Sequence, residues 1–377
     1  MPALTPKSVI EGRYRNRPTG GLIAGTIICG VCLLVVLAYD LLGAGPIHTV
    51  VGILLAVPSG LMVVGLLLLI DRLEPEPPTK MLFAFLWGAG VACLFALVIN
   101  TAGIALIFTP QFGPKGGMMV GASIGAPIVE ETLKGLVLLI FLWRSRDEID
   151  GPTDGIIYAG MVGIGFAVVE DVNYYLQAMS TSGAALAFTF VLRGLLSPLC
   201  HPIFTSMTGL GITYAANHRG GRGVLAVLAG WVGAMLLHAT WNFSSSFGFG
   251  GLAVAYGILL VVIVILIVLL VRDRRRVVGL IRRYLPAYHA TGSVTPADVA
   301  MLSTLRERSQ ARRWAAGRFG KIGKRAMADY QLAATELALL HSHAESRTVD
   351  PRRYAFRQDT LVRLMVDAHN VFAPRRG

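Results

Sequence analysis

Three charged residues inside an apolar run are the clearest candidates for chemistry in this chain. Glu130, Glu131 and Lys134 lie within residues 121–143, a stretch that is otherwise apolar and long enough to cross a bilayer. An ionised side chain at the centre of a membrane helix costs about 2.5 to 3.5 kcal/mol on insertion scales, so such residues usually face the interior of a helix bundle. The run therefore predicts a buried polar site.

The next three apolar runs contribute further ionisable and amide side chains, which are Glu170, Asp171, Arg193, His201, His238 and Asn242. Glu130, Glu170, His201 and His238 each lie 14 or 15 residues from the end of their run that is nearest a basic loop. At a helical rise of 1.5 Å per residue, that separation is roughly 21 to 23 Å. We expect the four side chains to meet in one layer, in the half of the membrane away from those loops.

Two kinds of chemistry suit such a layer. Adjacent glutamates in a low-dielectric pocket do not both ionise easily, so we expect one of them to act as a general base for water, with His238 and Asn242 stabilising an oxyanion. Alternatively, Glu130, Glu170, His201 and His238 are suitable oxygen and nitrogen ligands for zinc. The chain contains no HExxH motif, and the sequence leaves both mechanisms open.

Simpler structural roles are available for the same residues. Glu130 and Lys134, four residues apart, also fit a buried ion pair, and His238 with Asn242 fits interhelical hydrogen bonding. Asp171 is expected to face the outer interface and be hydrated. Arg193 lies nearer the outer end of its run and is expected to extend toward the interface. These roles do not explain why four successive runs carry such residues at one depth.

The apolar runs predict an all-α polytopic membrane protein. Hydrophobic residues make up 54% of the 377 residues and charged residues 15%. Eight runs are long enough to span a bilayer: residues 21–43, 50–70, 81–108, 119–143, 155–176, 184–215, 224–246 and 251–271. The sixth run has Pro198 and Pro202 around His201, so we expect a kinked or interrupted helix there.

Basic residues predict the orientation and the domains. One set of span ends carries Lys7, Arg13, Arg15, Arg17, Arg72, Lys80, Arg144, Arg146, Arg219, Arg222 and the cluster of residues 272–276, whereas the other carries only Lys115. Both termini are thus expected in the cytosol. The predicted domains are a basic N-terminus at 1–20, a membrane domain at 21–271 and a basic helical tail at 272–377.

The tail carries the whole net charge of the chain. Residues 1–271 contain 13 basic and 13 acidic residues, while residues 272–377 contain 21 and 9. Beside a membrane, such a tail is expected to face anionic lipid, in preference to nucleic acid. Thr295, Pro296 and Asp298 are typical of a helix start and predict a helix to about Gly317, with further helices at 324–345 and 352–369.

With these residues laid out, the chain resembles the PrsW family of bacterial intramembrane proteases, which is related to the CAAX prenyl endopeptidases. The ordered matches are Glu130-Glu131-x-x-Lys134, Phe166-x-x-x-Glu170, His201 and His238-x-x-x-Asn242. They fall within residues 120–246. The family commonly has asparagine after the second glutamate, where this chain has Asp171.

The resemblance implies an intramembrane endopeptidase of the bacterial cell membrane. Glu130 and Glu131 would be central, joined by Glu170, His201, His238 and Asn242, with Lys134, Phe166 and Asp171 in support. The substrate class that it implies is a single-span membrane protein of the anti-sigma type. Two rival predictions follow from the residues alone: a proton-coupled transporter or channel, and an inactive membrane scaffold. Substrate cleavage would separate the protease from both rivals. A pH-driven flux would identify the transporter.

Overall fold

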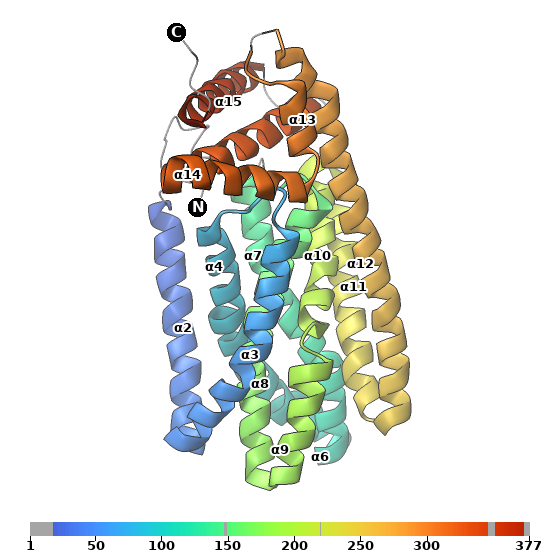
Figure 1. Ribbon diagram of the computed structural model, residues 1–377. Coiled ribbons are helices and arrows are strands. Elements are labelled where there is room, and N and C mark those ends of the chain that lie inside the picture. The colour runs from blue at the N-terminus through green and yellow to red at the C-terminus, as the bar shows by residue number, and fades with distance from the viewer. Residues whose placement is uncertain (1–17, 147–148, 219, 291, 346–350, 373–377) are drawn as a thin grey trace. The chain divides into compact units, whose positions relative to one another are not determined.

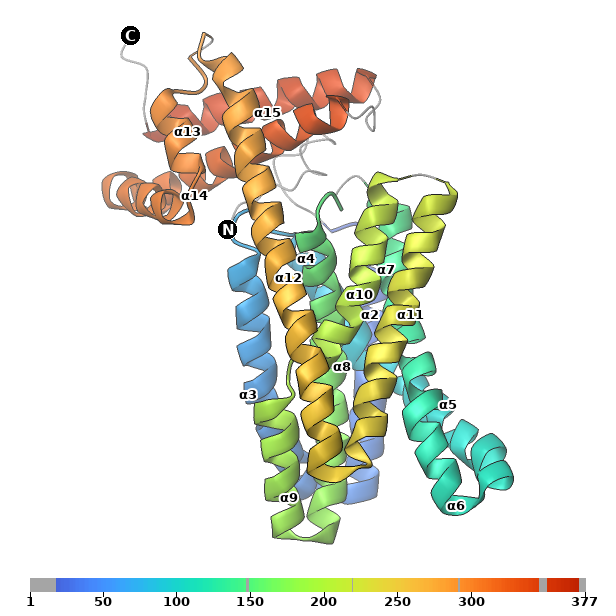
Figure 2. The same cartoon turned by 90° about the vertical axis from the view of Figure 1, so that its right-hand side faces the viewer.

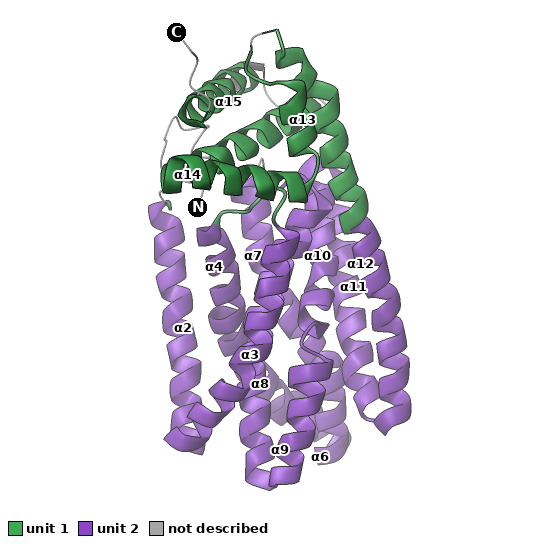
Figure 3. Cartoon of the chain, viewed as in Figure 1, with its two compact units in different colours: residues 1–18, 72–77, 270–377 green, residues 19–71, 78–269 purple. Residues whose placement is uncertain are grey.

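The protein is entirely α-helical in the part of the chain that its computed structural model describes, residues 18–146, 149–218, 220–290, 292–345 and 351–372 (Figure 1). The predicted basic positions Lys7, Arg13, Arg15, Arg17 and Arg219 lie outside these residues. The described residues form two compact units (Figure 3). One contains residues 19–71 and 78–269, and the other contains residue 18, residues 72–77 and the described residues from 270 onward.

The larger unit consists of long apolar helices. Its elements, including π-helical turns labelled η, are α2 (Gly20–Ala44), α3 (Pro46–Ile70), α4 (Pro78–Leu86), η1 (Trp87–Ala92), α5 (Cys93–Gly103), η2 (Ile104–Phe108), α6 (Thr109–Val120), η3 (Gly121–Gly125), α7 (Ala126–Arg144), α8 (Pro152–Thr181), α9 (Gly183–Thr189), η5 (Phe190–Leu196), α10 (Cys200–Asn217), α11 (Gly221–Ser245) and the start of α12 (Gly248–Tyr284). Hydropathy and length together make the chain a multi-pass membrane protein.

Seven helical segments in the described residues are apolar and long enough to cross a membrane. One of them, Pro78–Arg144, has 67 residues and contains two of the predicted spans. Its backbone leaves the helical conformation at Gly113, where φ is 71°, a value that favours glycine. The chain turns back there (Figure 2), and α5 packs against α7. The seven segments therefore accommodate the eight predicted crossings.

Helix α8 is the centre of the larger unit. In its most apolar 18 residues 89% are buried, against 11% in α2. Glycines on α8 permit this packing: a Cβ at Gly163 would lie 2.6 Å from the backbone nitrogen of Pro202, and one at Gly165 would lie 2.1 Å from the carbonyl oxygen of Phe85. Close approach at Gly163 brings the start of α10, with His201, directly against α8.

The sixth predicted span is interrupted, as expected. Helix α9 passes into the π-helical turn η5, the chain leaves helical geometry over residues 197–199, and α10 begins at Cys200. Two prolines fit this break: Pro198 lies within it and lacks an N–H donor, and Pro202 sits in the first turn of α10, where a donor is not needed.

The smaller unit contains the end of α12, then η6 (Leu285–Tyr288), α13 (Pro296–Leu302), α14 (Leu305–Glu345) and α15 (Pro351–Phe372). The predicted helix start at Thr295 is confirmed, and Thr295 and Asp298 form a capping box there. The prediction of one helix to Gly317 is wrong, because α13 ends at Leu302 and the Thr304 side chain caps a new helix through the backbone N–H of Glu307. Gly320, with φ of 62°, then breaks α14.

Candidate active site

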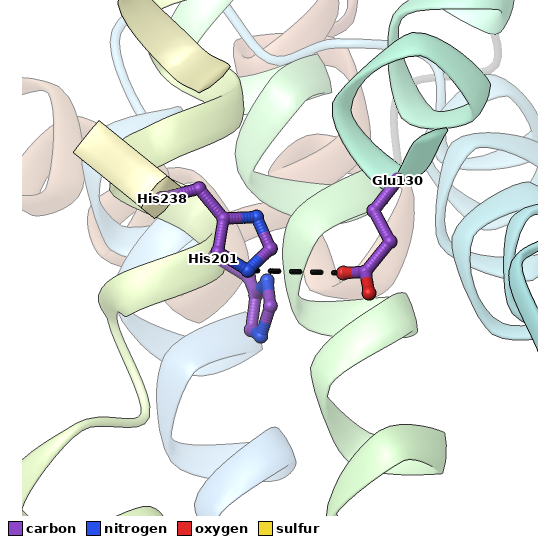
Figure 4. Close-up of side chains that lie close together, drawn as sticks. All are labelled: Glu130, His201 and His238. Carbon is purple, nitrogen blue, oxygen red and sulfur yellow. Dashed lines mark ion pairs between the residues drawn. The ribbon is translucent and has the colours of Figure 1, made fainter. Parts of the chain in front are cut away.

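Four helices of the larger unit bring the predicted side chains together. Glu130, Glu131 and Lys134 come from α7, Glu170 from α8, His201 from α10 and His238 from α11. Figure 4 shows His201 and His238 beside the Glu130 carboxylate. The His201 and His238 rings have centroids 5.0 Å apart. The expected meeting of these side chains is thus confirmed.

Glu131 is the best-satisfied carboxylate of the cluster. It is fully buried and accepts hydrogen bonds from Lys134 Nζ at 2.8 Å, from Thr205 Oγ1 at 3.0 Å and from His238 Nδ1 at 3.1 Å. Three donors from three helices fit an ionised carboxylate that holds its neighbours in place. Glu131 therefore has the contacts of a positioning residue.

Glu130 has a different environment although it is the adjacent residue. Its Oε1 accepts from Asn100 Nδ2 at 3.2 Å. Its Oε2 is buried without a hydrogen-bond partner and lies 3.7 Å from Lys134 Nζ and 3.8 Å from His238 Nε2. A buried carboxylate oxygen without a partner is costly, which indicates an atom kept available for a ligand or a proton.

The two histidines are held through their ring nitrogens by different partners. The Lys134 ammonium can only donate, so His201 Nδ1 accepts from it at 2.8 Å and His201 Nε2 donates to Glu170 Oε2 at 2.9 Å. The Glu131 carboxylate can only accept, so His238 Nδ1 donates to it. The Nε2 atom of His238 lies 3.8 Å from Glu130 Oε2.

Lys134 and Phe166 complete the buried centre. The Lys134 ammonium lies 3.8 Å from the centroid of the Phe166 ring, and this ring in turn packs against His201 with centroids 5.3 Å apart. Phe166 thus shields the Lys134 charge on the side that has no carboxylate. Both residues have the supporting positions that the family motifs imply.

The structure corrects two expectations. Asp171 does not face a hydrated interface, since it is only 4% exposed and accepts from Arg193 Nε at 2.5 Å. Arg193 does not extend to the interface, since a second nitrogen of its guanidinium, Nη2, donates to Glu170 Oε2. Two charge-assisted hydrogen bonds to adjacent acids hold the guanidinium inside the bundle.

Asn242 lies one turn beyond His238 on α11. Its amide nitrogen donates to the carbonyl oxygen of Ala122 at 2.9 Å, within the π-helical turn η3 that precedes α7. A π-helical turn leaves a backbone carbonyl available for such a bond. Asn242 therefore ties α11 to the start of the helix that carries both glutamates.

Sequence reasoning did not select two residues of this network, Asn100 and Thr205. Asn100 is an amide within an apolar run, and Thr205 lies four residues after His201 on the same helical face. Both features are visible in the sequence. However, threonine and asparagine are common in membrane helices, so neither indicates a partner without the fold.

The donor atoms fit a divalent metal of the zinc type. One ligand atom from each of Glu130, His201 and His238 lies within 4.8 Å of the other two. Glu130 Oε2 has no hydrogen-bond partner and lies 3.8 Å from His238 Nε2, and a carboxylate with two imidazoles is a common zinc ligand set. Both ring nitrogens of His201 are engaged, so His201 would exchange one hydrogen bond for the metal. Glu170 lies behind His201 and accepts from it.

The fold and the site define a polytopic membrane protein with a buried carboxylate and histidine centre. Residues 76–270, just over half of the chain, match the family described as PrsW family intramembrane metalloprotease. The chain therefore belongs to the PrsW family.

Three relatives are each named Protease PrsW. The relative from Geobacillus kaustophilus is 29% identical over 153 residues, which are 41% of this chain and 61% of the relative. The one from Oceanobacillus iheyensis is 29% identical over 116 residues, 31% of this chain and 50% of the relative. The one from Bacillus subtilis is 25% identical over 187 residues, 50% of this chain and 79% of the relative. The chain spans less than two thirds of the length of the first two, and no solved structure matches it.

Proposed function

We propose that this protein is an intramembrane endopeptidase that hydrolyses a peptide bond of a single-span membrane protein. The observation that carries the proposal is the buried, unpartnered Oε2 of Glu130 beside the imidazole of His238. Membership of the PrsW family and the name of the relatives support the same activity. The cleaved segment would enter from the bilayer, and we place both termini in the cytosol of a bacterium.

Glu130 is the proposed general base. Its Oε2 takes a proton from the attacking water and later gives it to the leaving amine, so one carboxylate serves both steps. Glu131 and Lys134 hold His238 and His201 around that oxygen. Asn242 Nδ2 has a second hydrogen beyond the one given to Ala122, and it remains the proposed oxyanion donor.

In the alternative, metal-dependent mechanism, a zinc ion would be held by Glu130, His201 and His238, and Glu130 would be a ligand in place of the base. When bound, it would supply Lewis acidity to the substrate carbonyl or to water. The roles of Glu131, Lys134 and Phe166 in orienting the imidazoles are the same with or without the ion, because none of the three is a ligand.

The decisive experiment compares Glu130→Gln and Glu131→Gln in purified protein reconstituted with a single-span membrane reporter. Glu130→Gln should lower cleavage at least about 100-fold with little change in thermal stability. Glu131→Gln should lower both cleavage and thermal stability, because it removes the charge that balances buried Lys134. Glu345→Gln, at an exposed position, is the matched control.

Full cleavage by both glutamine variants would overturn the proposal. Absence of cleavage together with pH-driven flux that needs Glu130 would favour a transporter instead. Metal analysis of active wild-type protein, together with chelator sensitivity, then separates the two mechanisms. Stoichiometric zinc that is lost in His238→Gln supports the metal mechanism. Activity without bound metal supports the glutamate mechanism.

We also propose that the smaller unit binds anionic lipid through the first half of α14. Between residues 306 and 325 the exposed charged side chains are six bases and one acid: Arg306, Arg313, Arg318, Lys321, Lys324, Arg325 and Glu307. Trp314 is 48% exposed and Ile322 is 73% exposed among them. Exposed apolar groups among bases are typical of a segment at an anionic membrane surface.

Hydrogen exchange of residues 310–325 tests this lipid proposal. In nanodiscs we expect stronger protection with phosphatidylglycerol than with phosphatidylcholine, and loss of the difference when Arg318, Lys321, Lys324 and Arg325 are changed to glutamine. Equal protection in both lipids would refute it, and protection by added RNA alone would assign the segment to nucleic acid.

A further inference from the structure

Arg193 binds two adjacent carboxylates at once. Its Nε donates to Asp171 Oδ1 at 2.5 Å, its Nη2 donates to Glu170 Oε2, and its guanidinium carbon lies 3.8 Å from the centroid of the Tyr174 ring. The planar guanidinium is therefore fixed on both edges and on one face. The Arg193, Glu170 and Asp171 side chains are 17%, 20% and 6% exposed.

The oxygen that Arg193 holds is also the oxygen that holds His201. Glu170 Oε2 accepts from Arg193 Nη2 and from His201 Nε2. His201 Nδ1 is occupied by Lys134 on the other side. The orientation of the His201 ring is thus set by one cation directly and by a second cation acting through Glu170.

Arg193 also anchors the broken span. It lies in η5, before the non-helical residues 197–199, whereas His201 lies just after them. Gly194 lets η5 approach α8 closely, because a Cβ there would lie 2.9 Å from the hydroxyl oxygen of Tyr175. Arg193 therefore links the segment before the break to α8.

Charge explains why aspartate is tolerated at position 171. Asp171 and Glu170 are neighbours on α8 and both are largely buried, so their negative charges repel. Arg193 forms ion pairs with both of these carboxylates, whereas Lys134 forms its ion pairs with Glu130 and Glu131. Asparagine at 171 would remove the repulsion without any need for the arginine.

From these contacts we infer that Arg193 is a positioning residue that orients His201 through Glu170, and that Asp171 is its charge-matched partner. The inference rests on the proposed function only for its effect on cleavage. Arg193→Gln leaves two like charges side by side, so Glu170 moves away from His201 Nε2. Adding Asp171→Asn removes that repulsion and restores the contact.

The test combines four variants: Arg193→Gln, Arg193→Lys, Asp171→Asn and the double variant Arg193→Gln/Asp171→Asn. The first readout is the ring ¹⁵N signal of His201 in histidine-labelled protein, assigned by its loss in His201→Gln. We expect it to shift in Arg193→Gln and to return toward the wild-type position in the double variant and in part in Arg193→Lys. Arg222→Gln, an exposed arginine at the start of α11, is the matched control.

The second readout is zinc affinity and cleavage. Loss of a residue that orients a metal ligand typically costs 10- to 100-fold in affinity or activity, and we expect that loss in Arg193→Gln. The double variant should regain about tenfold. The inference is overturned if the His201 signal is unchanged in Arg193→Gln. It is also overturned if the double variant loses as much cleavage as the two single variants together. If neither the wild type nor any variant cleaves the reporter, the proposed function fails. The His201 signal still decides the role of Arg193 in that case.

Discussion

Among the described residues, Lys134 and Arg308 are the most deeply buried long cations of the larger and the smaller unit, and they are satisfied in opposite ways. Lys134 in the larger unit lies against two carboxylates and an imidazole. Arg308 in the smaller unit donates to neutral oxygens, the carbonyls of Leu302 and Leu73 and the hydroxyl of Thr335. Lys134 is 0% exposed and Arg308 is 2% exposed.

The difference teaches which buried charge belongs to a reactive centre. The Arg308 donors are used to join three segments of the smaller unit, and burial lowers its pKa only to about 10, so it stays charged at neutral pH. Lys134 instead faces groups that can exchange protons or bind metal. A buried cation among neutral acceptors indicates structure, whereas one among acids and histidines indicates chemistry.

Removing the two cations should have the largest and the most different effects. Lys134→Met leaves Glu131 buried without its cation and should cost about 3 to 5 kcal/mol of stability in the larger unit, with loss of cleavage. Arg308→Met leaves neutral carbonyls unsatisfied and should cost about 1 to 3 kcal/mol. Region-resolved hydrogen exchange on the full chain measures both.

Lys115→Met, at an exposed position of the larger unit, controls for the loss of a lysine charge. Zinc binding should fall in Lys134→Met and stay at the wild-type level in Arg308→Met. An equal fall in both variants would remove the distinction between a structural and a reactive cation.

A smaller effect is expected from two threonines on α10. Thr205 donates to Glu131 Oε2 at 3.0 Å, while the Thr208 hydroxyl is buried without a partner. Thr205→Val should therefore cost about 1.5 to 3 kcal/mol, since the lost bond is to a charged group. Thr208→Val should be neutral or stabilising. Thermal unfolding in detergent gives both values, and the reverse order would contradict the assignment of Glu131 as the positioning carboxylate.

The smallest effect is a pH dependence of the smaller unit. His341 contacts the hydroxyls of Tyr288 and Tyr354, and burial lowers its pKa below the ordinary 6.5, although Glu345 opposes the shift. The unfolded chain then binds a proton at a higher pH than the folded one. The contribution of His341 to the free energy of unfolding is therefore fully present above about pH 6.5, and it is lost as the pH drops below that value.

Asp329 works in the opposite direction, because burial raises its pKa to about 6 and folding is then favoured as the pH drops through 6. The difference between wild type and His341→Gln isolates the histidine. Hydrogen exchange of residues 330–345, corrected for the intrinsic rate at each pH, should show the acid-induced loss in wild type only. The same loss in both proteins would assign it to another group.

Local patterns were enough for much of the membrane unit. Apolar runs of 18 residues or more predict the spans because hydrocarbon requires internally bonded helices. The predicted runs 21–43 and 224–246 lie within a few residues of α2 and α11. The tail helices were harder: Ser303 and Thr304 divide the predicted helix after Leu302, and local side-chain capping competes there with a continuous helix.

The sequence by itself determined that costly polar residues recur on four successive membrane helices at similar depth, since their distance from the helix ends depends only on helical rise. Only the tertiary structure decided that Glu131 is fully bonded while Glu130 keeps a free oxygen. Neighbouring residues on a helix point in directions about 100° apart, so their environments depend on which helices pack on each side. Arg193 was assigned wrongly for the same reason, because only packing brings it to Glu170 and Asp171.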